Sequence, residues 1–299
     1  MTAAGRPASV RRRARLARGP VTIGEPAAAV EARLAAGEPY RPDTIADGGN
    51  VFGLTVRAAS VRGLYKRYTG GPRQDDVCLR VHQASGTLVA AVADGVSGAA
   101  RSGLGAALAV RYATAAVARQ LDDRAGPLDW ASVFEHAAWS LVEEHRRASG
   151  DGGAGAEEAS ESLATTLLVA AVRGAEVEVA AVGDSPAFVL HGKDYDPVVG
   201  SSETVDGFVG GGVESLPRFS GAGAVAVARR SLGSGEVLLL CTDGLAMPLA
   251  GGAGEVGRAL ARELARPPDV VDFARLLDFS RSTYDDDRSL IAVWAAGRS

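Results

Sequence analysis

The amino-acid sequence predicts a layered α+β domain that follows a weakly structured N-terminal extension. Short apolar runs separated by glycine-containing turns succeed one another as antiparallel strands do, and they stand between pairs of helical segments. The chain has 299 residues, 46% of them hydrophobic and 23% charged, so it is long enough to bury a large core. We expect a flexible, basic and alanine-rich extension over residues 1–50 and one domain over residues 51–299.

The first half of the domain is expected to contain a strand, a hairpin and two helices. Alternating apolar residues indicate strands, and apolar residues at helical spacing among good helix formers indicate helices. Asp129 precedes the second helix and is a suitable N-cap. The expected elements are a strand at 52–63, a hairpin at 77–94 that turns at Ser85-Gly86, and helices at 99–121 and 130–147.

The second half begins with a Gly/Ala/Glu-rich linker at 151–159 and continues with more strands than helices. A glycine-rich stretch at 200–223, with GFVGGGV at 207–213, predicts a mobile flap. The remaining expected elements are strands at 164–172, 176–182, 187–191, 225–228, 237–241 and 289–294, and helices near 254–265 and 269–282.

Acidic residues stand at the ends of three predicted strands. Asp94-Gly95 and Asp243-Gly244 each close an apolar run, and residues 285–287, all aspartate, precede the final strand. One Asp-Gly pair alone is usually a turn, but three acidic strand ends in one chain suggest a shared site. Carboxylates brought together repel one another, and a hard divalent cation such as Mg²⁺ or Mn²⁺ relieves that repulsion. Two such ions can activate a water for in-line attack on phosphorus.

Composition excludes several classes of function. A net charge of −4 and a pI near 5.7 argue against nucleic-acid binding, and the basic run at 11–18 is better explained as a solvated tail than as an anionic-surface contact. The two cysteines, Cys78 and Cys241, sit in apolar runs as buried reduced thiols do. Without a membrane span or an apolar signal segment, we expect a cytoplasmic protein.

Six short motifs then carry a resemblance to a known family. They are Arg73-Gln74-Asp75-Asp76, Ala93-Asp94-Gly95-Val96-Ser97-Gly98, Ala164-Thr165-Thr166, Val182-Gly183-Asp184-Ser185, Cys241-Thr242-Asp243-Gly244-Leu245 and Asp286-Asp287-Arg288-Ser289. This series, over residues 54–296, resembles the metal-dependent serine/threonine protein phosphatases of type 2C (PPM), in particular their bacterial branch. The resemblance implies a four-layer α-β-β-α sandwich with two central antiparallel sheets and a metal site at one edge.

The resemblance also implies roles for individual residues. Asp94 would bridge two Mn²⁺ or Mg²⁺ ions, with the Gly95 carbonyl as a further ligand, and Asp243 and Asp286 would complete the shell of the first ion. These three aspartates would act in catalysis through the bound metals. Asp75 would hold a metal-bound water, and Glu161 stands where the family often binds a third ion.

Some positions depart from the family pattern. Gln74 stands where many members have glutamate, so one water-mediated metal contact loses its charge. Gly70 and Gly71 fall where the family's phosphate-binding arginine is expected, so that Lys66, Arg67 or Arg73 must substitute, and we assign the role to Arg67 and Arg73. His82 is a conceivable general acid, although a histidine in an alternating strand is more often structural.

The predicted function is hydrolysis of phosphoserine and phosphothreonine in proteins by direct attack of a metal-activated water. The expected partners are a phosphorylated protein and a cognate Ser/Thr kinase. The alternative is a phosphatase-fold regulatory module with weak or no catalysis. A dinucleotide-binding enzyme is disfavoured because the glycines after residue 94 do not follow G-x-G-x-x-G. Cysteinyl-phosphate and aspartyl-phosphate routes lack their motifs.

Overall fold

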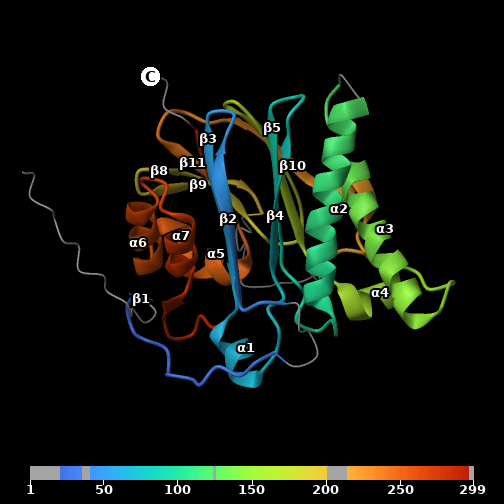
Figure 1. The fold of residues 1–299 in the computed structure, drawn as a ribbon, viewed down its shortest axis with the longest axis horizontal. Coiled ribbons are helices and arrows are strands. Elements are labelled where there is room, and N and C mark those ends of the chain that lie inside the picture. The colour runs from blue at the N-terminus through green and yellow to red at the C-terminus, as the bar shows by residue number, and fades with distance from the viewer. Residues whose placement is uncertain (1–20, 36–40, 124–125, 201–213, 296–299) are drawn as a thin grey trace, which may run out of the picture.

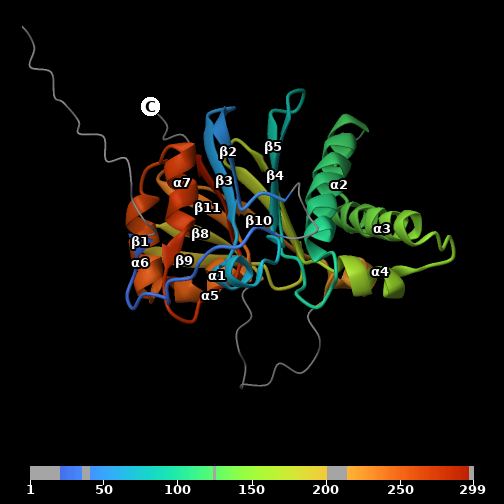
Figure 2. The same cartoon turned by 60° about the horizontal axis from the view of Figure 1, so that its bottom comes forward.

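The computed structural model describes residues 21–35, 41–123, 126–200 and 214–295. Two antiparallel sheets are stacked between two layers of helices, and Figures 1 and 2 show α2 and α3 on one side and α5, α6 and α7 on the other. The five-stranded sheet has the order β10-β7-β6-β5-β4, and the six-stranded sheet has the order β2-β3-β13-β11-β8-β9. The α+β class and the pair of central antiparallel sheets predicted from the sequence are therefore confirmed.

The strands and helices have the following bounds. The five-stranded sheet consists of β4 (Asp76–His82), β5 (Thr87–Ala93), β6 (Leu167–Arg173), β7 (Glu176–Val182) and β10 (Ala226–Ser231). The six-stranded sheet consists of β2 (Thr44–Val51), β3 (Leu54–Val61), β8 (Ala187–His191), β9 (Asp194–Val199), β11 (Glu236–Cys241) and β13 (Arg288–Ala295). A short parallel pair joins β1 (Val21–Thr22) to β12 (Phe279–Ser280). The helices are α1 (Leu64–Thr69), α2 (Ser102–Asp123), α3 (Trp130–Ser149), α4 (Ala156–Leu163), α5 (Asp243–Leu249), α6 (Glu255–Glu263) and α7 (Val270–Leu277), with 3₁₀ turns η1 (Gly221–Ala224) and η2 (Ala250–Gly252).

Three apolar layers fill the spaces between the four structural layers. Strand β5 shows how the sequence achieves this, because all seven of its residues are buried and alternate side chains point to opposite faces. Leu88, Ala90 and Val92 pack between the two sheets. Val89 and Ala91 pack under α2 and α3. An uninterrupted apolar run is therefore the expected signature of a strand covered on both faces.

Helix α3 follows its sequence signals closely. The Asp129 side chain accepts a hydrogen bond from the Ser132 N–H at 3.1 Å, which confirms the predicted N-cap. Gly150 ends the helix with φ +75°, a left-handed conformation that glycine adopts at little cost. Among the described residues, no helix is long and apolar enough to span a membrane.

Several predicted elements were wrong in extent or kind. The linker at 151–159 is partly helical, because α4 begins at Ala156 and the Glu158 carboxylate accepts the Gly155 N–H at 2.8 Å. The helix expected over 269–282 ends at Leu277, and the chain then enters β12. The flap predicted at 200–223 is not among these and stays a prediction, because most of it, residues 201–213, lies outside the described residues.

Strand β2 begins at Thr44, inside the region that the sequence assigned to the extension. Its run DGGN is depleted in strand-forming side chains, and pairing with β3 along its whole length overrides that weak preference. The sheet therefore takes in residues before 51, and the boundary between extension and domain stays a prediction.

Candidate functional site

Strand pairing brings the predicted acidic residues to one edge of the two sheets. In the five-stranded sheet Asp76 pairs with Ala93, so Asp75 and Asp94 flank the same end of the hairpin. In the six-stranded sheet Cys241 pairs with Leu290, so the ends that carry Asp243 and Asp286 also coincide. This edge lies beside α1 at the bottom of Figure 1.

Asp75 joins the two sheets at this edge. Its carboxylate is buried and accepts hydrogen bonds from the hydroxyls of Thr242 and Ser289, both at 2.8 Å. Burial, and next the Asp287 carboxylate, raise the pKa of Asp75 to about 7, against the opposing effects of Lys66 and the two hydroxyls. These contacts fix the carboxylate in one orientation, although residues 75, 242 and 289 are far apart in the sequence.

The buried side chain of Arg73 holds Asp75 in place through its backbone carbonyl and through two serine hydroxyls. Its guanidinium donates to the Ser60 hydroxyl at 2.8 Å and to the carbonyl of Asp75, and the Ser60 and Ser289 hydroxyls lie 2.7 Å apart. The Arg73 side chain is 1% exposed. A polar chain therefore runs from a buried cation through two serines to the buried carboxylate of Asp75.

Asp94 and Asp243 form a close carboxyl pair. The pKa of Asp94 lies well above its usual value, first because of burial and then because of the charges of Asp75 and Asp243, a hydrogen bond with Asp243 and the charge of Asp286. Asp184 lies close as well, and burial followed by the charge of Asp243 raises its pKa. Sequence reasoning missed Asp184, although its Gly-Asp-Ser motif was recognised.

The turn that carries Asp94 is held by Thr165 and Thr166. The Asp94 N–H donates to the Thr166 hydroxyl at 3.1 Å, while its carbonyl accepts the Thr166 N–H and the Thr165 hydroxyl, both at 2.8 Å. The Thr166 hydroxyl also lies 2.8 Å from that of Ser185. A Cβ at Gly95 would lie 2.8 Å from the Gln74 carbonyl oxygen, so glycine allows the close approach of these two loops.

Thr166→Val is expected to lower the free energy of unfolding by about 2 kcal/mol, because it leaves the Asp94 N–H and the Ser185 hydroxyl without their partner. Urea denaturation followed by circular dichroism measures the change. Thr22→Val, at an exposed position of β1, is the matched control and should change stability by less than about 0.5 kcal/mol. Equal effects of the two substitutions would contradict the role given to Thr166.

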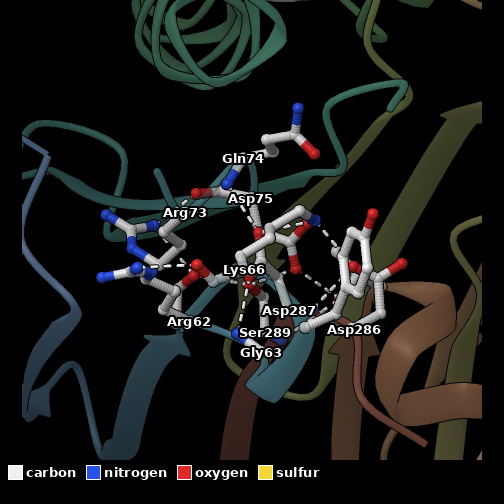
Figure 3. A network of polar contacts seen from close by, with 12 residues as sticks. Arg62, Gly63, Lys66, Arg73, Gln74, Asp75, Asp286, Asp287 and Ser289 are labelled. Atoms are coloured by element: carbon white, nitrogen blue, oxygen red, sulfur yellow. Dashed lines mark hydrogen bonds and ion pairs between the residues drawn. The ribbon is translucent and has the colours of Figure 1, made fainter. Parts of the chain in front are cut away.

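The three consecutive aspartates before β13 have three different environments. Asp285 is exposed, whereas the buried Asp287 carboxylate accepts the N–H groups of Gly63 at 2.7 Å and Gln74 at 2.6 Å. Asp286 lies between them and turns to Lys66, whose Nζ is 2.6 Å from Asp286 Oδ1 and 3.1 Å from Asp287 Oδ2 (Figure 3). Burial acts to lower the pKa of Lys66, but the charges of Asp287, Asp286 and Asp75 outweigh it, so the pKa is raised.

Three further residues that the sequence assigned to the site, Arg67, Arg73 and Glu161, have partners elsewhere in the fold. Arg67 pairs with Asp43 and Asp278, both at 2.7 Å, and Arg73 points inward as described above. Glu161 is exposed on α4, and its carbonyl accepts the Ala100 N–H at 3.2 Å.

His82 lies at the far end of β4 from Asp76. Its ring nitrogens are 2.9 Å from Asp122 Oδ1 and 2.7 Å from the Ser85 hydroxyl. These contacts tie the hairpin to α2, and His82 is therefore too remote to serve as the general acid of this site.

The donor set at the edge suits a hard divalent cation. Asp75, Asp94, Asp243 and Asp286 offer only oxygen, and the closely placed carboxyls of Asp94 and Asp243 are of the kind that Mg²⁺ and Mn²⁺ bind. Within the described part of the chain, however, no three Asp, Glu, His or Cys side chains converge on one point as metal ligands do. The Asp286 carboxylate instead contacts the ammonium group of Lys66. The residues therefore fit the metals in chemistry, and Asp286 would have to turn.

Solved structures share this fold. A serine/threonine phosphatase of S. agalactiae is 16% identical with a TM-score of 0.57, over 81% of this chain and 99% of that chain. PppA of Pseudomonas aeruginosa is 18% identical with a TM-score of 0.54, over 83% and 100%. The catalytic domain of the phosphatase PstP, solved in complex with two manganese ions, is 19% identical with a TM-score of 0.51, over 80% and 97%. At these identities the likeness establishes the fold alone.

Sequence comparison identifies the family. None of the curated proteins matches this chain. The family model described as protein phosphatase 2C matches residues 62–286, which include five of the six motifs in full and the first residue of the sixth. The resemblance inferred from the motifs is thereby confirmed, and the chain belongs to the protein phosphatase 2C family.

Proposed function

We propose that this protein is a metal-dependent phosphoprotein phosphatase that hydrolyses phosphoserine and phosphothreonine. The observation that supports this most strongly is the carboxyl pair of Asp94 and Asp243, with Asp75 and Asp286 close enough to raise the pKa of Asp94. Four carboxyl groups from separate segments repel one another unless cations or protons neutralise them. Divalent cations bound at this site would neutralise the four carboxylates and remove that repulsion.

The residues have distinct tasks in this proposal. Asp94, the Gly95 carbonyl, Asp243 and Asp286 would hold two Mn²⁺ or Mg²⁺ ions, and Glu161 on α4 would contribute to a third. When bound, such ions activate a water and stabilise the charge that develops on the phosphoryl group. Asp75, fixed by Thr242 and Ser289, would orient a water beside Asp94.

A cation is also needed to hold the phosphate of the substrate. The sequence assigned this to Arg67 and Arg73, but the contacts of both favour another candidate. Arg67 is paired with Asp43 and Asp278, and Arg73 is buried, where its guanidinium donates to the Ser60 hydroxyl and the Asp75 carbonyl. Lys66 is the cation that lies against the acidic residues, 2.6 Å from Asp286. We therefore assign the phosphate to Lys66 ahead of the two arginines.

The partners follow from the proposed reaction. The substrate would be a phosphorylated protein, and a Ser/Thr kinase that produces it would be the functional counterpart. The catalytic unit would comprise residues 51–299 together with β2, and residues 1–50 would otherwise remain an extension.

Hydrolysis of p-nitrophenyl phosphate and of a phosphothreonine peptide is the direct test. The wild type should turn both over with Mn²⁺ and lose activity with a chelator. Asp243→Asn should lower kcat/KM by about 100-fold or more because it removes a charged metal ligand from the pair with Asp94. Turnover that survives both the chelator and the substitution would place the reaction elsewhere.

A regulatory module without catalysis is the second candidate. It is favoured by the contact of Lys66 with Asp286, since a protein cation already neutralises one of the proposed ligands. Such a module would bind a partner without metal and show no turnover in Mn²⁺ or Mg²⁺. Folded protein that lacks activity with either metal would support this candidate over the phosphatase.

A further inference from the structure

Figure 3 shows the ammonium group of Lys66 against the carboxylates of Asp286 and Asp287. Lys66 lies on α1, where its side chain is 10% exposed, and its Nζ contacts Asp286 at 2.6 Å and Asp287 at 3.1 Å. Only two of the 32 basic residues in the chain are lysines, Lys66 and Lys193. A compact ammonium group on a flexible stem can leave one carboxylate for another more easily than the rigid fork of an arginine can.

The two carboxylates that Lys66 contacts differ in freedom. Asp287 is 1% exposed and anchored by the N–H groups of Gly63 and Gln74, so it cannot turn without breaking buried hydrogen bonds. Asp286 is 50% exposed. Its Oδ1 accepts the ammonium and the Asp287 N–H at 2.8 Å. Asp287 is therefore a fixed anchor for Lys66, whereas Asp286 is a carboxylate that can be exchanged.

We infer that Lys66 is an intramolecular counter-ion that competes with the divalent metal for Asp286 and thereby lowers the metal affinity of the site. This inference rests on the proposed function, in which Asp286 is a metal ligand. Asp286 can bind the metal in one of two ways. It releases the ammonium group of Lys66, or it contacts both cations, so that only its own carboxylate separates the ammonium group from the divalent ion. Both alternatives weaken metal binding. Asp287 retains Lys66 in the site after the exchange, so the released ammonium is not left unpaired.

Competition has a consequence for the metal-free protein as well. Without metal, Lys66 offsets part of the repulsion among Asp75, Asp286 and Asp287, so its loss should destabilise that form. With saturating metal, the divalent ion offsets the same repulsion, and the loss of Lys66 should matter less. A residue that only supported α1 would give equal effects in both states.

Isothermal titration calorimetry with Mn²⁺ tests the inference on the full chain. Lys66→Met, which keeps the length of the side chain and removes its charge, should bind Mn²⁺ about tenfold more tightly than the wild type. Lys193→Met, in the exposed turn between β8 and β9, is the matched control and should bind as the wild type does. In thermal melts, Lys66→Met should lower the Tm with a chelator present and show a larger upward shift on addition of Mn²⁺.

The outcomes separate this inference from the proposed function. If the wild type binds Mn²⁺ and Lys66→Met binds it equally or more weakly, the metal site stands and the competition is refuted. If folded wild type and Lys66→Met both fail to bind Mn²⁺, the metal site itself is refuted, and the competition with it. Should Lys66→Met not fold, Lys66→Gln gives the same comparison, with a polar end that can still bond to Asp287.

Discussion

Replacing Asp287 by alanine is expected to lower the free energy of unfolding by about 3–5 kcal/mol, a range typical of breaking a buried charged network. The substitution removes the acceptor of two backbone N–H groups, those of Gly63 and Gln74, and the anchor of the Lys66 ammonium. Each buried donor left without a partner costs about 1–3 kcal/mol. Urea denaturation of the metal-free protein measures the loss.

The neighbouring aspartates provide the controls for this substitution. Asp285→Ala should change stability by less than about 0.5 kcal/mol because its side chain is exposed. Asp287→Asn keeps one carbonyl acceptor and should fall between the two alanine variants. A loss for Asp287→Ala no larger than that for Asp285→Ala would show that the Gly63 and Gln74 loops do not depend on this carboxylate.

The sequence predicts the acidic strand ends because local patterns specify them. Short apolar runs such as residues 88–93 and 237–241, each bounded by turn residues, favour buried strands, and the Asp-Gly pairs mark where they end. Antiparallel pairing places Asp75 beside Asp94 in one sheet and Asp243 beside Asp286 in the other. The stacking of the two sheets, which the local patterns do not specify, then brings these two ends to one edge. The order of the six motifs supplied the family, which the sequence could reach without the structure.

What the sequence could not predict depends on contacts between distant segments. No local pattern indicates that Lys66 reaches Asp286 across 220 positions, or that Thr242 and Ser289 converge on Asp75. The same holds for strand β2, whose glycines disfavour a strand, and for the six-residue helix α1, which is too short to show a helical period. The sequence could name Lys66, Arg67 and Arg73 as candidates for the phosphate but could not rank them by their contacts, since each cation finds its partners only in the folded chain.

Gly244→Ala is expected to destabilise the protein by about 3 kcal/mol, although alanine is the better helix former. Gly244 is the second residue of α5, and a Cβ there would overlap the carbonyl oxygen of Asp287. Gly63 also lies tightly against residues 285 and 286, so two glycines allow the close packing of residues 285–287, the acidic loop. The loop can therefore accept a new methyl group only by moving away from Asp243.

Movement of that loop should affect stability and metal binding together. The proposed ligands Asp243 and Asp286 lie on the two segments that the new methyl group would separate, so Gly244→Ala should also weaken Mn²⁺ binding in calorimetry. Gly49→Ala is the matched control because a Cβ at this exposed position of β2 meets no atom within 4 Å. If Gly244→Ala were as stable as Gly49→Ala, there would be room for a methyl group between α5 and residues 286 and 287, and their close packing would not depend on glycine.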